Sequence, residues 1–172
     1  MRKLHKLFLA TALCAGAAQA GMIDYLNGVS LGEPLPVHQI RYLDKAPDPQ
    51  ARLTLIDFWA TWCAGCIASI PQLNGWQKKF GADGLAVIGA TQDSDDDGAL
   101  KRFLVKFPME YPIGLEGKPG LHDLLKIRAM PYAILVDSKD IIVWRGQPES
   151  LSDAVIAHYL SRSVSAQSAP GP

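Results

Sequence analysis

The stretch at residues 53–71, LTLIDFWATWCAGCIASIP, constrains the fold most, because it joins a buried strand to a helix through two cysteines. Residues 53–60 form an almost continuous apolar run, which is typical of a central strand covered on both faces. After Cys63 and Cys66, apolar residues recur every three or four positions and predict the buried stripe of a helix, with a kink at Pro71. The stripe consists of Ile67, Ile70, Leu73, Trp76 and Phe80.

The N-terminus predicts a secretory signal peptide rather than part of the fold. A basic start is followed by an apolar run at residues 7–18 and by a small-x-small cleavage site, Ala18-Gln19-Ala20. A membrane anchor is less favoured, because spanning a bilayer takes roughly 20 apolar residues. We therefore expect cleavage after Ala20, export to the periplasm, a single domain at residues 21–162 and a disordered tail at residues 163–172.

Cleavage changes both the charge and the cysteine count. The leader carries three of the 17 basic residues and no acidic one, so the mature chain has 14 basic residues against 17 acidic ones and a net charge of −3. Nothing in this balance indicates binding to nucleic acid or to an anionic membrane. Cleavage also removes Cys14, so any sulfur chemistry has to use Cys63 and Cys66.

The pattern after the first helix predicts more strands of the same sheet. Residues 85–91 form a second buried strand, which completes a βαβ unit. Residues 133–136 and 141–144 predict an antiparallel hairpin. Ser150, with Asp153 three residues later, resembles a capping box at the start of a last helix.

Two further segments surround this frame. Residues 37–43 predict a short early strand, within an N-terminal extension. Residues 100–107 predict a helix, residues 111–115 a short strand, and Pro119 opens a short helix, which together make a central insert. Because crossovers between parallel strands are right-handed, helices should cover both faces of one mixed sheet. The chain is therefore predicted to be a three-layer α/β/α sandwich.

The chemistry of the cysteine pair follows from its place on a helix. Helix N-termini and the C-x-x-C spacing lower a thiol pKa to roughly 3.5 to 7.5, so Cys63 is predicted to be the nucleophile. It attacks a partner disulfide, and Cys66 then attacks the mixed disulfide and releases the reduced partner. Proximity makes this second step effectively intramolecular.

Three other interpretations of the pair are weaker. A zinc site needs about four ligands, and the mature chain offers no third cysteine and only scattered histidines. Covalent haem attachment needs a histidine directly after the second cysteine, where this chain has Ile67. A structural disulfide is common in exported proteins, but a bridge over so short a loop constrains the unfolded chain little. We therefore expect no metal and no cofactor beyond the Cys63/Cys66 disulfide.

The segment IDFWATWCAGC at residues 56–66, Pro71, and Met130-Pro131 before a strand resemble the thioredoxin superfamily. The export signal and the central insert make the chain most similar to its exported TlpA/ResA-like branch. The resemblance implies a thioredoxin-like fold and a periplasmic reductase of protein disulfides. It also implies a membrane electron donor of the DsbD or CcdA kind, and we expect a monomer.

The resemblance also implies roles for particular residues. Cys63 is the attacking thiol, Cys66 the resolving thiol and Trp62 an aromatic flank of the site. Pro131 is a cis-proline facing the cysteines, and Met130 offers backbone groups to an extended substrate segment. The cis form occurs at only about 5 to 6% of X-Pro bonds in folded proteins, so this assignment comes from the resemblance alone.

Asp57 interrupts the apolar strand, where an ionised carboxylate is costly and burial raises its pKa. We expect it to take the proton of Cys66 during attack on the mixed disulfide. The alternative is an aspartate at a strand end that is bonded to backbone or faces water. Members of this branch commonly have asparagine at this position and a basic residue and a glutamate after the second cysteine, where this chain has Ile67 and Ser69.

These departures leave the substrate open, because the missing glutamate is associated with cytochrome maturation. The direction of electron flow is open as well, since Ala64-Gly65 between the cysteines does not fix a potential within the roughly −270 to −120 mV of protein couples. The alternatives to a reductase are a disulfide oxidant or isomerase, and a non-catalytic binding or chaperone module. A peroxidase of this fold would need a threonine three residues before its reactive cysteine, whereas Thr61 lies two before Cys63.

Overall fold

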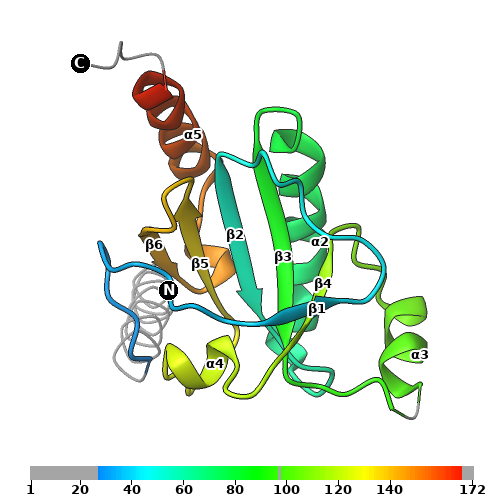
Figure 1. Ribbon diagram of the computed structural model, residues 1–172. Helices are drawn as coiled ribbons and strands as arrows, with labels where there is room; N and C mark the ends of the chain where they lie inside the picture. Colours follow the sequence, from blue (N-terminus) through cyan, green and yellow to red (C-terminus); the bar gives the residue numbers. More distant parts are fainter. Residues whose placement is uncertain (1–26, 97, 168–172) are drawn as a thin grey trace, which may run out of the picture.

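A computed structural model describes residues 27–96 and 98–167 (Figure 1). The predicted signal peptide and residues 168–172 lie outside the described residues. The last helix, α5 (Asp153–Gln167), runs five residues beyond the predicted domain boundary at residue 162. It continues because no glycine or proline occurs between Asp153 and Pro170.

Within the described residues, six strands form one mixed sheet in the order β1-β4-β3-β2-β5-β6. The central strands β2 and β3 run parallel with Leu53 beside Leu85, as the predicted βαβ unit requires. Strand β4 is parallel to β3, whereas β5 is antiparallel to β2 and β6 is antiparallel to β5. The strands are β1 (Ile40–Tyr42), β2 (Leu53–Phe58), β3 (Leu85–Thr91), β4 (Ile113–Glu116), β5 (Tyr132–Asp137) and β6 (Ile142–Gly146).

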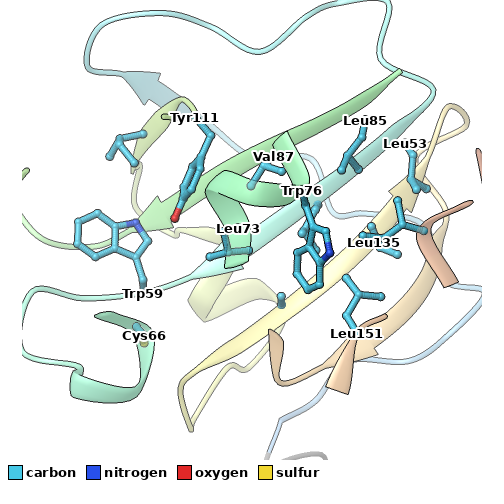
Figure 2. Close-up of a cluster of buried hydrophobic side chains, with 14 of the residues drawn as sticks. Leu53, Trp59, Cys66, Leu73, Trp76, Leu85, Val87, Tyr111, Leu135 and Leu151 are labelled. Carbon is cyan, nitrogen blue, oxygen red and sulfur yellow. The ribbon is translucent and has the colours of Figure 1, made fainter. Parts of the chain in front are cut away.

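One face of the sheet packs against long helices. Helix α2 (Ala64–Phe80) follows β2 and continues through Pro71 (Figure 1), and α5 contributes Ile156 and Leu160 to the same core. Helix α3 (Ala99–Lys106) adds Leu100 to the same core. Figure 2 shows this core, which includes Leu53, Leu73, Trp76, Leu85, Val87, Leu135 and Leu151.

The opposite face has a thinner cover. The short helix α4 (Leu121–Leu124) packs there together with residues from the N-terminal extension, including Val29. The extension is tied to the sheet by an isolated bridge between Pro34 and Ile141. The predicted three-layer α/β/α sandwich is therefore confirmed, with a third layer that combines one helical turn and an extended segment.

The predicted capping box at Ser150 is wrong. Ser150 belongs to a short 3-10 turn, η1 (Pro148–Ser150), where its hydroxyl donates to the carbonyl of Gln147 at 2.8 Å. Because of this turn, α5 begins only at Asp153, and the Ser152 hydroxyl caps it by accepting from the Val155 amide at 3.4 Å. The Asp153 carboxylate is thereby free to accept from the Trp76 indole at 2.8 Å, which joins α5 to α2.

Candidate functional site

Cys63 and Cys66 lie where strand β2 passes into helix α2, as the sequence predicts. The connecting loop is fixed by the Thr61 amide, which donates to the Asp93 carboxylate at 2.6 Å, and by the Cys63 amide, which donates to the Ala60 carbonyl at 3.0 Å. Cys63 is the N-cap of α2, and its sulfur accepts from the Cys66 amide at 3.2 Å. The two sulfurs form a disulfide with an S–S distance of 2.03 Å.

The two sulfurs differ in their surroundings. Cys63 is 6% exposed, whereas Cys66 is 1% exposed and its sulfur lies 3.8 Å from the Phe58 carbonyl oxygen. The first turn of α2 carries no acidic residue, so the positive end of the helix is not neutralised there. After reduction this arrangement favours a thiolate at Cys63, while a Cys66 thiol can donate to the Phe58 carbonyl.

The chain brings the Met130-Pro131 segment to the cysteine loop. The Met130-Pro131 peptide bond is cis. A Cβ atom added to Gly65 would lie 3.0 Å from Cδ of Pro131, so the proline ring packs directly against the residue between the cysteines. Trp62 is 75% exposed beside Cys63. Of the predicted substrate-binding residues, Pro131 and Trp62 therefore lie next to the cysteine pair, and Met130 directly precedes Pro131.

Asp57 lies inside the sheet, between Gly89 of β3 and Ala133 of β5. Its side chain is on the α2 face, because side chains alternate along a strand and Leu55 belongs to the core under α2. The residue is fully buried, and neither carboxylate oxygen has a hydrogen-bond partner among the described residues. Desolvation by burial raises the pKa of Asp57 to about 8.

Two more polar groups on the α2 face were not predicted from the sequence. The Trp59 indole nitrogen and the Tyr111 hydroxyl are buried without hydrogen-bond partners among the described residues. Figure 2 shows the Tyr111 hydroxyl directed toward the Trp59 indole. Burial, and then the charge of Asp57, raise the pKa of Tyr111 well above its usual value. Gly89 makes room here, since an added Cβ would lie 2.8 Å from the Trp59 indole nitrogen.

A second buried acid, also missed from the sequence, lies on the opposite face. The Glu116 side chain is fully buried and accepts from Nδ1 of His122 at 2.7 Å and from the His122 amide at 3.1 Å. Nε2 of His122 lies 3.4 Å from the sulfur of Met130. The His122 ring also meets the Phe58 ring edge-on, with centroids 4.9 Å apart.

In the part of the chain that the structure describes, no group of three or more histidine, cysteine, aspartate or glutamate side chains is arranged to hold a metal ion. Among the same residues, no helix is long and apolar enough to cross a membrane.

Comparison with known proteins gives the family. A model of the AhpC/TSA family matches residues 42–145, which is more than half of the chain. The chain belongs to the AhpC/TSA family. Its relatives include the thioredoxin-like protein YneN of Bacillus subtilis (strain 168), 26% identical over 121 residues that cover 67% of this chain and 70% of YneN. The thiol-disulfide oxidoreductase ResA of Bacillus cereus (strain ZK / E33L) is 22% identical over 149 residues, which cover 83% of this chain and 86% of ResA.

Another relative is the thiol:disulfide interchange protein DsbE of Pseudomonas fluorescens biotype C, 29% identical over 119 residues that cover 65% of this chain and 64% of DsbE. Among solved structures, a DsbE-type interchange protein of Chlorobium tepidum matches with a TM-score of 0.63 and 25% identity, over 77% of this chain and 99% of that one. The thioredoxin domain of a thiol-disulfide oxidoreductase of Bacteroides vulgatus matches with a TM-score of 0.61 and 21% identity, over 78% of this chain and 97% of that one. The predicted thioredoxin-like fold and the resemblance to the TlpA/ResA-like branch are confirmed.

Proposed function

We propose that this protein is a thiol-disulfide oxidoreductase that reduces disulfides of exported proteins through Cys63 and Cys66. The observation that carries the proposal is the disulfide at the N-terminus of α2, with Pro131 packed against the residue between the two cysteines. The names of the relatives ResA and DsbE support the same reaction class. The redox group is the cysteine pair itself, without a bound cofactor.

The reaction consists of two thiol-disulfide exchanges. In the reduced protein, the Cys63 thiolate attacks one sulfur of the substrate disulfide, and the other substrate sulfur leaves as a thiolate that takes up a proton. Cys66 then loses its proton and attacks the sulfur of Cys63. The Cys63–substrate bond breaks, the second substrate thiol is released, and the protein holds the Cys63–Cys66 disulfide. Two electrons have passed to the substrate.

Asp57 is the proposed acceptor of the Cys66 proton. Cys66 is 1% exposed, so bulk water has little access to its thiol once a substrate covers the site. A carboxyl group with a pKa of about 8 is close in affinity for protons to an ordinary thiol with a pKa of about 8.5, which makes transfer between them nearly balanced.

Substrate binding is assigned to the surface around Cys63. Met130 precedes the cis-proline and offers backbone groups to an extended segment, which Pro131 holds against the disulfide. Trp62 supplies an exposed aromatic surface beside the attacked sulfur. Regeneration requires a dithiol donor, for which we propose a membrane carrier of the DsbD or CcdA kind, with the protein acting as a periplasmic monomer.

A trapping experiment tests the reaction. The reduced Cys66→Ser variant should accumulate a mixed disulfide with insulin through Cys63, because the resolving thiol is missing. The matched Cys63→Ser variant should neither trap insulin nor reduce it, although it keeps one thiol at the same site. Reduction of insulin by Cys63→Ser at the wild-type rate would refute the proposal.

The direction of electron flow is tested by the reduction potential of the cysteine pair, measured by equilibration with glutathione or dithiothreitol. A reductant should lie toward the lower end of the roughly −270 to −120 mV of protein couples. A value near the upper end would assign the reverse reaction, disulfide formation, to the same two cysteines.

A further inference from the structure

The buried pair Glu116 and His122 takes no part in the exchange reaction described above, yet it ends at the substrate-binding segment. Glu116 is the last residue of β4, and His122 lies on α4, six residues further along the chain. The Glu116 carboxylate accepts from both the ring and the backbone amide of His122. The carboxylate therefore fixes both the position of the first turn of α4 and the orientation of the imidazole ring.

The other side of the imidazole faces Met130. Nε2 of His122 lies 3.4 Å from the Met130 sulfur, and a thioether sulfur is only an acceptor. The ring thus stands between two acceptors, a carboxylate at Nδ1 and a sulfur at Nε2. Through these two contacts the imidazole ring links the buried carboxylate to the methionine side chain.

Met130 occupies a position from which this link affects the active site. Its side chain is half-buried and packs against both core clusters, one on each face of the sheet. The next residue, Pro131, packs against Gly65 between the two cysteines. A methionine side chain has several rotatable bonds and adapts readily to its surroundings, so a fixed contact at its sulfur restricts the backbone segment that it belongs to.

We propose that His122, oriented by Glu116, is a positioning residue that holds Met130 and thereby presets the substrate-binding segment at residues 130 and 131. The ligand class is an extended polypeptide carrying a disulfide. The inference rests on the proposed function and deepens it, because it names the group that makes binding of such a polypeptide tighter than binding of a small disulfide.

Kinetics with two disulfides test the proposal, using insulin as the polypeptide and cystamine as the small disulfide. His122→Asn keeps an amide donor near the position of Nδ1 but has no atom at Nε2, so it should lose only the contact with Met130. We expect its KM for insulin to rise about fivefold, the size of one lost hydrogen bond, with kcat and the rate with cystamine unchanged. His122→Gln places an amide near Nε2 and should restore a KM close to that of wild type.

A double-mutant cycle with Met130→Leu separates the contact from general effects on folding. Met130→Leu alone should raise the KM for insulin by a similar factor, and His122→Asn should add nothing in the Met130→Leu background. Nitrogen NMR of the His122 ring should show the Nε2 signal, but not the Nδ1 signal, shifting in Met130→Leu. Each of these results would support the positioning role.

The outcomes also distinguish this inference from the proposed function. Equal KM values for insulin in wild type and His122→Asn, or full additivity in the cycle, would overturn the inference while leaving disulfide reduction intact. A wild-type protein that turns over neither insulin nor cystamine would overturn the proposed function and the inference together.

Discussion

Asp57 should make the stability of the folded protein fall as the pH rises. Its carboxyl group is fully buried without a partner among the described residues, and burial raises its pKa from 3.8 to about 8. Between these two values the native state holds a proton that the unfolded chain has released. Stability from this group is therefore greatest below the unfolded pKa, falls through the interval, and stays at its lower value above the folded pKa.

The size of the effect follows from the two pKa values. Each pH unit between them costs about 1.4 kcal/mol, so at about pH 7 the ionisable side chain lowers the free energy of unfolding by about 4 kcal/mol. Asp57→Asn replaces the carboxyl group with a neutral group of the same shape. The amide of the variant and the protonated carboxyl group of wild type are both neutral, and neither has a ready hydrogen-bond partner. Burying either group therefore costs a similar free energy, and the two costs largely cancel in the comparison. We therefore expect the variant to be more stable by about 4 kcal/mol near neutral pH and equal to wild type near pH 4.

Guanidinium unfolding of the oxidised protein, followed by tryptophan fluorescence between about pH 4 and pH 9, measures this difference directly. Asp83→Asn is a suitable control, because it makes the same chemical change on an exposed side chain. Wild type and Asp83→Asn should show the same dependence on pH, whereas Asp57→Asn should lack the decline. Curves for wild type and Asp57→Asn that stay parallel over the whole range would refute the burial argument.

Three further predictions concern the same side of the sheet. Release of substrate from the mixed disulfide, followed by stopped flow, should accelerate as the pH rises toward about 8 and Asp57 ionises, and Asp57→Asn should lose this acceleration. Tyr111→Phe removes a buried hydroxyl without a partner, so unfolding experiments should show a gain of up to about 1 kcal/mol, and a clear loss would mean that the hydroxyl is bonded. Hydrogen bonds from Lys79 and Trp76 lower the pKa of Asp153, so Asp153→Asn should lower stability at neutral pH, and this difference should shrink as the pH falls below 3.8.

Much of the fold follows from local patterns in the sequence. Strand β3 lies at residues 85–91 as predicted, because an apolar run between a glycine-containing turn and an acidic segment is typical of a buried strand. The start of α5 was misplaced, because Ser150 and Ser152 offer equivalent capping side chains and only the 3-10 turn at Pro148 decides between them. The thin third layer was not predictable either, since it depends on where the N-terminal extension crosses the sheet.

Some residues of the candidate site could likewise be predicted from the sequence, and others could not. Cys63 and Cys66 are visible because they are neighbours in sequence, and Asp57 is visible because it interrupts an apolar strand. Glu116 was missed because the predicted strand ended at Leu115, one residue short of the position whose side chain turns to the opposite face. His122 was missed because its partners lie on β4 and on the segment before β5, and a single histidine in a short helix gives no signal of such contacts.

The alternation of side chains along the strands places the two buried acids on opposite faces of the sheet. Asp57 points to the α2 face, whereas Glu116 points to the α4 face, where it reaches Met130 through His122. In the two proposals each buried acid therefore acts on a different step, Asp57 on proton transfer and Glu116 on substrate binding. Changes on the α4 face should alter KM for polypeptides and leave the release step unchanged. Changes at Asp57 should alter the release step and leave KM unchanged, so that the sheet allows the two properties to vary independently.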